Sequence, residues 1–303
     1  MAERLSFANL GAEEGARPSF FGEGSPVHRL AQHFEATVQK PPWRALAQVQ
    51  GMIAWMNTDE AVNQAERLGL PLWGAPAAVV RQVHDKGFAI ATAVKLGLVD
   101  DALAGTLTVL APHELQAALI EDTIGRWPPW ARAQATLKPR WGTSGRGRVA
   151  VRGGVLDERA RNGLAGLAAR GGAILEPWLE RVLDLSSQWL VLDDDAPRLL
   201  GCTRMITRRS GVWLGCEVHG GDDGQSSGTA WDGQLVAAAR PLVQAAADAG
   251  YRGVCGVDAF TWHNDGVERL RGVVELNARF TGGLIALASL HGIRGRASFR
   301  IQD

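Results

Sequence analysis

The chain has 303 residues, of which 46% are hydrophobic and 21% are charged. This composition excludes a disordered or collagen-like protein and indicates two or three lobes around sizeable cores. Lys and Arg total 32, as do Asp and Glu, so no overall positive field draws the protein onto nucleic acid or an anionic membrane. No apolar stretch approaches the roughly 20 residues of a membrane span, and the first residues lack the pattern of a secretory signal, so we expect a cytoplasmic protein.

Cysteine and histidine are scattered along the chain. Cys202, Cys216 and Cys255 form no CxxC pair, and the seven histidines form no HExxH motif and no i, i+4 pair. These patterns argue against a zinc site and against a disulfide framework. A metal site in this sequence would therefore be built from carboxylates.

The N-terminal part predicts an irregular segment and then a small α/β unit. Residues 1–45 are rich in Gly, Pro and charge, with one short helix beginning at His28. The unit that follows is a strand, a capped helix and a second strand, over residues 49–56, residues 59–68 between the Thr58 cap and Gly69, and residues 70–75.

The rest of the chain divides at Pro128-Pro129. Before these prolines the pattern predicts helices over 77–96, 100–110 and 112–124. After them it predicts strands over 135–138, 148–151, 173–176, 184–192, 198–207, 212–218, 253–262 and 272–277, and helices over 158–170 and 235–249. The C-terminal half is therefore expected to be mostly antiparallel α+β, different in kind from the N-terminal unit.

A lysine followed by a glycine-rich loop is the most informative segment. Lys138 ends a predicted strand, and the loop Gly142-Thr143-Ser144-Gly145-Arg146-Gly147 follows. Glycines let backbone N–H groups approach a phosphate, and such a loop can close over it as a flap. The loop lacks the Lys-Ser/Thr of a Walker loop and the third glycine of a dinucleotide fingerprint. The alternatives are a flexible basic surface loop, or a nucleic-acid site made by Arg140, Arg146, Arg148 and Arg152.

A hairpin between residues 256 and 277 carries three oxygen-bearing side chains. A turn centred on Gly266-Val267 places Asp258 directly opposite Glu275, whereas a turn at Asp265-Gly266 makes them diagonal neighbours on one face. Asn277 shares that face. Two adjacent carboxylates are costly without a cation, and Mg²⁺ typically takes one or two carboxylates together with phosphate and water. The alternative is a solvated sheet face.

Taken together, these segments resemble the ATP-grasp superfamily of carboxylate–amine ligases. The similar blocks, in the order of that family between residues 80 and 290, are His84-Asp85-Lys86, Leu137-Lys138-Pro139 with Gly142-Thr143-Ser144-Gly145, the hinge-like Glu176-Pro177-Trp178-Leu179, Val257-Asp258, and Glu275-Leu276-Asn277-Ala278-Arg279. The resemblance implies an α/β and α+β chain with the ATP-grasp fold, in which an N-terminal pre-ATP-grasp α/β domain precedes two α+β lobes that clamp ATP. The expected domains are 1–80 (pre-ATP-grasp), 81–180 (central domain with the flap) and 181–303 (C-terminal domain with the metal site).

The resemblance also implies a role for each matching residue. The nucleotide would be held by Lys86 and Lys138 on its phosphates under the flap, by Glu176 on the adenine amino group beside the backbone of Trp178 and Leu179, and by Asp184 or Glu180 on the ribose. Mg²⁺ would be coordinated by Asp258, Glu275 and Asn277. The acyl phosphate or the charged groups of the acceptor would be held by Arg279, and the transferred phosphate would be reached by Arg204, Arg208 or Arg209.

The implied reaction is ATP-dependent amide or peptide bond formation. The γ-phosphoryl group of ATP passes to a carboxylate, giving ADP and an acyl phosphate, and an amine then displaces phosphate; catalysis is mainly positioning and charge neutralisation. The implied partners are small-molecule carboxylate and amine substrates such as amino acids or peptides, with no nucleic acid and no membrane. Two alternatives remain: an ATP-binding or regulatory protein that does not ligate, and a nucleic-acid-binding protein that uses the Arg140–Arg152 cluster.

The two ends of the chain leave further questions. Residues 54–57 and 69–75 are similar to the pre-ATP-grasp domain of amino-acid and peptide ligases, where Asn57 and Gly74 would either line the cleft or only shape turns. The chain ends soon after Arg279. A partner subunit or the N-terminal segment could complete the acceptor pocket, and a homodimer stays open.

Overall fold

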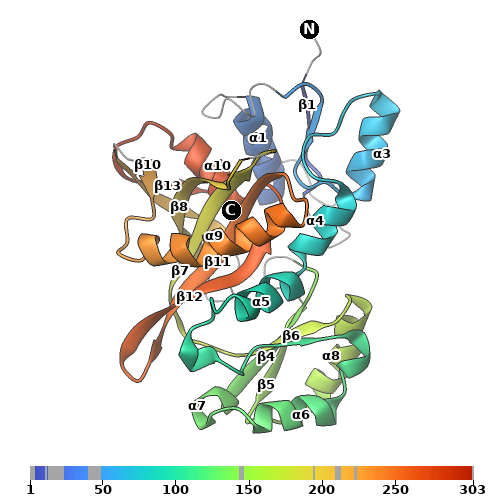
Figure 1. Ribbon diagram of the computed structural model, residues 1–303, viewed down its shortest axis with the longest axis vertical. Coiled ribbons are helices and arrows are strands. Elements are labelled where there is room, and N and C mark those ends of the chain that lie inside the picture. Colours follow the sequence, from blue (N-terminus) through green and yellow to red (C-terminus); the bar gives the residue numbers. More distant parts are fainter. Residues whose placement is uncertain are drawn as a thin grey trace.

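Two antiparallel sheets form most of the molecule, the larger in the upper part of Figure 1 and the smaller in the lower part. The computed structural model describes residues 4–10, 12, 24–39, 49–142, 147–193, 195–208, 213–221 and 224–301. Helix α5 lies between the two sheets in Figure 1 and contacts strands of both. Helices and sheets are mixed as the predicted α/β and α+β class requires.

The N-terminal segment confirms the first strand and the helix of the predicted unit, whereas the predicted strand over 70–75 is only a single bridge at Leu72, and the strand Leu5–Phe7 was not predicted. Its elements are β1 (Leu5–Phe7), β2 (Met52–Ala54) and α3 (Asp59–Leu68). Strand β1 pairs in parallel with β2, and Met52 also makes a parallel bridge to Leu72 beyond α3. The Thr58 side chain accepts a backbone hydrogen bond at the start of α3, and Gly69 ends the helix with a φ of 62°. Both predicted ends of this helix are confirmed.

The predicted helical region over 77–96 is confirmed as helical, and it forms two helices that part at Asp85. The two are α4 (Ala77–His84) and α5 (Lys86–Lys95). Asp85 between them has extended ψ of 124°, and its carboxylate accepts a 2.7 Å hydrogen bond from the Gly87 N–H. An Asp side chain satisfies a free N–H at a helix start, which makes a break there favourable. The break places Lys86 at the first turn of α5.

The smaller sheet and its helices form a lobe with its own hydrophobic core. The elements are β3 (Thr108–Leu110), α6 (Ala117–Gly125), α7 (Pro129–Arg132), β4 (Gln134–Pro139), β5 (Val149–Arg152), α8 (Glu158–Ala169) and β6 (Ala173–Pro177). The strand order is β3-β6-β4-β5, and every pairing is antiparallel. Leu137, Ile120 and Leu167 are among the buried side chains between sheet and helices.

The region before this lobe departs from the prediction. The predicted helix over 100–110 was wrong: only Asp101–Leu103 forms a helical turn, and the following residues pair with β6 as strand β3. β-branched side chains at Thr108 and Val109 favour the strand. The helix predicted over 112–124 begins as the 3₁₀ turn Pro112–Glu114 and continues as α6.

The larger sheet confirms the predicted antiparallel C-terminal half. Its strands are β7 (Arg181–Val191), β8 (Arg198–Thr207), β9 (Trp213–Gly221), β10 (Gly224–Ser226), β11 (Gly253–Asn264), β12 (Val267–Asn277) and β13 (Gly295–Arg300). The order is β10-β9-β8-β7-β11-β12, with β13 also on β9. Helix α9 (Asp232–Asp248), which runs through Pro241, contacts β7 and β12.

Strand β13, near the end of the described chain, pairs with β9 in the larger sheet, and the sequence did not predict this strand. Helix α10 (Gly282–Ser289) packs on β7, β8 and β9, and α1 (Pro26–Gln39) packs on α10.

Among the described helices, none is long and apolar enough to cross a bilayer.

A small apolar cluster joins the two sheets. It contains Leu103, Leu179 just after β6, and Phe260 and Trp262 on β11, all buried. Burial of Leu179 against β11 fixes the chain where it passes from the smaller sheet to the larger one.

Candidate active site

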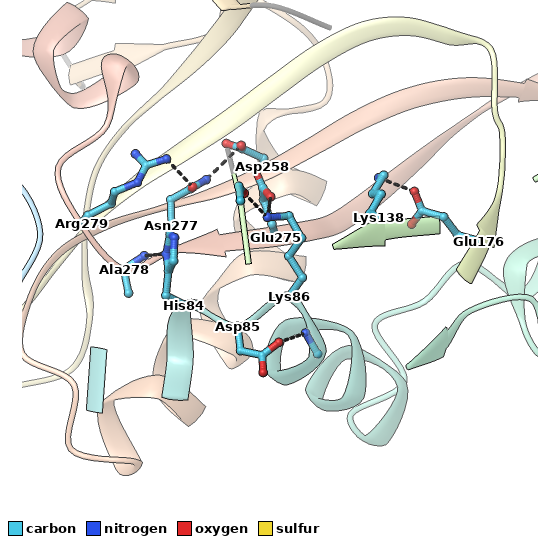
Figure 2. Close-up of polar contacts among 12 residues, drawn as sticks. His84, Asp85, Lys86, Lys138, Glu176, Asp258, Glu275, Asn277, Ala278 and Arg279 are labelled. Atoms are coloured by element: carbon cyan, nitrogen blue, oxygen red, sulfur yellow. Dashed lines mark hydrogen bonds and ion pairs between the residues drawn. The ribbon is translucent and has the colours of Figure 1, made fainter. Parts of the chain in front are cut away.

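Most of the predicted site residues meet where the lobes adjoin. Figure 2 shows Lys86 reaching the end of the β11–β12 hairpin, with Lys138 and Glu176 of the smaller sheet to one side. The site draws on α5, on β4 and β6 of the smaller sheet and on the β11–β12 hairpin of the larger one, so it exists only in the folded chain.

A shift in strand pairing sets the position of the two carboxylates. The hairpin turns at Asp265-Gly266, with φ of 50° and 76°, and Phe260 accordingly pairs with Arg271. Beyond that pair, residues 272–274 of β12 stand opposite the single residue 259 of β11. This bulge brings Asp258 directly opposite Glu275, which combines the turn of one predicted alternative with the pairing of the other.

Asp258 accepts two hydrogen bonds in this position. Ser186 Oγ donates to its Oδ1 at 2.7 Å and Asn277 Nδ2 donates to its Oδ2 at 3.0 Å. Burial, and then the negative charge of Glu275, raise the pKa of Asp258 to about 7. The Asp258 carboxyl group is therefore expected to take up a proton near neutral pH.

Glu275 is ionised beside it. Lys86 Nζ lies 3.0 Å from Glu275 Oε2. Burial alone would raise the pKa of Glu275, but the charge and hydrogen bond of Lys86 lower it to about 2. The Lys86 ammonium pairs with Glu275 and not with Asp258, so the two adjacent carboxyl groups make a place where a further cation would be favourable.

The donor set suits a hard divalent cation. Among the described residues, no three His, Cys, Asp or Glu side chains cluster as a metal site. The set is instead two carboxylates and one amide, as the sequence predicted, and Mg²⁺ commonly binds few protein carboxylates. Asn277 Oδ1 accepts a 3.0 Å hydrogen bond from Arg279 Nη2. An Asn277 that binds a cation would turn this oxygen toward Asp258.

Lys86 connects Glu275 to the start of the predicted flap. Its Nζ also donates to the Gly142 carbonyl at 2.6 Å. Beside it, the Arg140 guanidinium forms an ion pair with Asp85. Arg140, one member of the alternative nucleic-acid cluster, is therefore already neutralised. Thr143, Ser144, Gly145 and Arg146 lie outside the described residues.

Lys138 and Glu176 form a buried ion pair with a third member. Lys138 Nζ contacts Glu176 Oε1, and Arg271 Nη2 of β12 donates to Glu176 Oε2 at 2.6 Å. Burial opposes ionisation of Glu176, but Arg271 and Lys138 hold its pKa at about 2. Burial lowers the pKa of Lys138 to about 8, against the pull of Glu176. The sequence predicted Lys138 and Glu176 but missed Arg271.

The hinge residues lie beside this ion pair. The Trp178 N–H donates to the Gln134 carbonyl at 2.8 Å, which continues the pairing of the smaller sheet. The Trp178 ring is exposed, and the Arg148 guanidinium lies 5.0 Å from its centre. A nucleotide base at this hinge would have the Trp178 carbonyl and the Leu179 N–H as backbone partners.

Arg279 is held by the backbone around it. Its Nη1 donates to the Phe280 carbonyl at 2.9 Å, and its guanidinium lies 5.9 Å from the Trp55 ring centre. His84 Nδ1 accepts from the Ala278 N–H at 3.2 Å. Burial, then the charges of Arg279 and Lys86, lower the pKa of His84 well below 6.5. Neutral His84 therefore supports the backbone just before Arg279.

Two other predicted residues, Asp184 and Asn57, have clear local partners. Asp184 accepts from Arg181 at 2.8 Å and from Thr207 at 2.7 Å. Asn57 donates to the Trp73 and Ala75 carbonyls at 2.9 Å, and thus shapes the turn that contains Gly74.

Arg204 lies apart from the carboxylate pair. Its guanidinium is 2.5 Å from Glu217. Asp258 pairs with Ser186, and Ser186 pairs with Thr203, so these three share one face of the sheet. Arg204 is next along the strand and therefore points to the opposite face. A contact between Arg204 and a phosphate at Asp258 stays a prediction that this arrangement disfavours.

A buried hydrogen-bonded chain behind Asp258 was also missed by the sequence analysis. Thr281 Oγ1 donates to Gln188 Oε1 at 2.5 Å, and Gln188 Nε2 donates to Ser186 Oγ at 2.8 Å. Ser186 is then left to donate to Asp258. The only sequence signal was the polar run Ser186-Ser187-Gln188 within a buried strand.

Comparisons with known proteins show which fold the chain has. No protein-family model and no curated protein sequence matches the chain. Among solved structures it is similar to the biotin carboxylase domain of 2-oxoglutarate carboxylase from Hydrogenobacter thermophilus, in complex with MgADP, ADP and bicarbonate, with a TM-score of 0.57 and 15% identity over 90% of this chain and 56% of that one. It is also similar to biotin carboxylase from Campylobacter jejuni, with a TM-score of 0.54 and 13% identity over 96% of this chain and 66% of that one.

A third similar structure is carboxyaminoimidazole ribonucleotide synthase from Aspergillus clavatus complexed with ATP, with a TM-score of 0.53 and 14% identity over 92% of this chain and 71% of that one. The chain spans little more than half the length of the Hydrogenobacter domain, which was the first of the three similar structures. These proteins have the ATP-grasp fold, and so does this chain.

Proposed function

We propose that the chain is an ATP-dependent carboxylate–amine ligase that works through an acyl phosphate. The observation that carries this is the cross-strand pair Asp258 and Glu275, with Asn277 beside them and Lys86 on Glu275. The similar structures bind MgADP or ATP, which supports nucleotide binding here. The residues that follow are assigned within that proposal.

Mg²⁺ would be held by Asp258, Glu275 and the Asn277 amide oxygen, and would neutralise phosphate charge there. Lys86 and Lys138 would bind phosphate oxygens, which requires each ammonium to leave its present carboxylate. The Gly142 loop would cover the phosphates. Such positioning and neutralisation is the main source of rate in phosphoryl transfer.

The adenine would lie at the hinge. Glu176 would accept from its amino group, beside the Trp178 carbonyl and the Leu179 N–H, and Asp184 would bind the ribose once its contact with Arg181 opens. Residues 1–80 would form the pre-ATP-grasp domain in this proposal, ahead of the central and C-terminal ATP-grasp domains.

Arg279 would hold the acyl phosphate or a charged group of the acceptor. It adjoins Asn277 and is fixed by Phe280 and Trp55. Its guanidinium can bind phosphate oxygens in pairs, which suits an acyl phosphate. An amine would then attack the acyl carbon and expel phosphate, leaving an amide or a peptide bond.

Trapping the intermediate tests the proposal. The protein is incubated with Mg²⁺, ATP and single amino or small organic acids, with hydroxylamine in place of the amine. A ligase of this class gives ADP and a hydroxamate that depend on one particular acid, and Glu275→Gln gives neither. Nucleotide binding without ADP release across a broad set of acids would favour a non-catalytic ATP-binding protein instead.

A further inference from the structure

The Glu176 carboxylate is neutralised from two different sheets. Lys138 comes from β4 of the smaller sheet and Arg271 from β12 of the larger one, and each contacts its own carboxylate oxygen. The three side chains are buried: Glu176 is 4% exposed, Arg271 3% and Lys138 12%. Arg271 is thus the cation that ties the hinge region to the metal-bearing hairpin.

A buried carboxylate cannot lose its only cation without a large penalty, because an uncompensated charge would remain in a poorly solvated place. In the part of the chain that the structure describes, two cationic side chains contact Glu176, so one can leave. Arg271 is the fixed one: its side chain is almost fully buried, and its guanidinium lies 5.5 Å from the Phe260 ring centre.

Lys138 is the one that can move. Its side chain is the more exposed of the two, and its long stem is flexible. Its positive charge already acts on Glu275 as well as on Glu176, so its ammonium lies within electrostatic reach of Glu275. Repulsion from Arg271 further weakens its hold on the hinge carboxylate.

We propose that Arg271 is a positioning residue that keeps Glu176 neutralised while Lys138 moves from Glu176 to the phosphates of a bound nucleotide. This inference rests on the proposed function, because it needs a nucleotide between the lobes. Arg271 itself would touch no part of the nucleotide. Its effect would reach the phosphates only through the charge on Glu176.

The proposal predicts that the effect of Arg271→Met on nucleotide binding depends on whether residue 176 carries a negative charge. In Arg271→Met, Lys138 becomes the one cation in direct contact with Glu176 among the described residues and is held there, so binding of MgADP weakens by roughly tenfold or more. When Glu176 is changed to Gln, no buried carboxylate needs a cation. Arg271→Met should then have little further effect on binding.

The experiment is calorimetric titration of MgADP into wild type, Arg271→Met, Arg271→Lys, Glu176→Gln and the double variant Glu176→Gln/Arg271→Met. We expect Arg271→Lys to bind close to wild type and the double variant to bind as Glu176→Gln does. Arg269→Met is the matched control, since Arg269 lies two residues away on β12 and pairs with Asp100. Thermal unfolding without ligand reports whether each variant is folded.

The outcomes separate this inference from the proposed function. No MgADP binding by wild type would overturn both. Binding by wild type together with unchanged binding by Arg271→Met would overturn the role of Arg271 alone. A double variant that binds much more weakly than Glu176→Gln would also overturn it, even if Arg271→Met by itself does not fold.

Discussion

Asp258 and Glu275 are direct cross-strand neighbours because the hairpin that carries them contains a bulge at residues 272–274. The turn at Asp265-Gly266 alone would have left the two carboxylates diagonal. The bulge therefore decides whether both side chains can reach one cation.

Gly272 in this bulge is packed against α9, which leads to the first prediction. A Cβ at Gly272 would lie 2.4 Å from the Ala238 Cβ. Gly272→Ala should lower the free energy of unfolding by about 1–3 kcal/mol, since overpacking forces the strand and helix apart. Chemical denaturation measures this.

Ala238→Gly in the same chain is the matched second change. By itself it should cost about 1 kcal/mol, because glycine is a poor helix former. Combined with Gly272→Ala it removes the clash, so the two losses should sum to clearly more than the loss of the double variant. Strict additivity would refute the packing explanation.

The second prediction concerns Glu275. Glu275→Gln keeps the shape of the side chain but removes the charge that pairs with Lys86. We expect ATP turnover to fall by at least about 100-fold, comparable to the loss of one group that stabilises transition-state charge. Glu158→Gln, an exposed position at the start of α8, should leave turnover unchanged. Turnover is measured as ADP release, and wild-type rates in Glu275→Gln would contradict the metal assignment.

The third prediction tests the support behind Asp258. Ser186→Ala removes the donor to Asp258 Oδ1 and leaves Gln188 Nε2 without its acceptor. Loss of such a supporting contact typically weakens metal binding about 10-fold to 100-fold. Titration with Mn²⁺, followed by its paramagnetic signal, measures affinity without turnover. Ser298→Ala, on an exposed site of β13, is the control, and equal affinities in both variants would exclude the predicted role.

The fourth prediction is a dependence of stability on pH. The pKa of His84 is well below 6.5 in the folded chain, through burial and then Arg279 and Lys86, against a weaker opposing effect of Glu275. Below pH 6.5 the unfolded chain therefore binds more protons than the folded chain, so the unfolding free energy decreases as the pH is lowered, by up to about 1.4 kcal/mol per pH unit.

His84→Asn removes this titration, while its amide oxygen can still accept from the Ala278 N–H. The acid slope of its unfolding free energy should be flatter than that of wild type. Exposed His113→Asn should keep the wild-type slope. Parallel slopes for wild type and His84→Asn would show that His84 does not titrate as the structure requires.

Local signals in the sequence were enough for some elements and not for others. Helix α3 was predicted at both ends because Thr58 and Gly69 act on their immediate neighbours. The helical pattern over 77–96 did not by itself mark the break at Asp85, although the resemblance made Asp85-Lys86 a helix start. The ion pair of Asp85 with Arg140, 55 residues away, adds support that the sequence does not reveal.

In the candidate site, too, the features with local sequence signals could be predicted and those that depend on distant residues could not. The Asp258, Glu275 and Asn277 face could be predicted from strand alternation, but their exact pairing could not, because neither candidate turn by itself specifies the bulge at residues 272–274. Arg271 was missed because its partner Glu176 is 95 residues away and belongs to the other sheet. Long-range charge pairs of this kind carry no local pattern.

The most direct test of the central claim is thermal unfolding with and without MgATP, for wild type, Lys138→Met and the exposed control Lys95→Met. A ligand at 100 times its dissociation constant stabilises the folded state by about 2.7 kcal/mol, which shifts the melting curve visibly. We expect this shift in wild type and Lys95→Met, and a much smaller one in Lys138→Met. A wild-type melting curve that MgATP leaves unmoved would contradict the nucleotide site and, with it, the ligase.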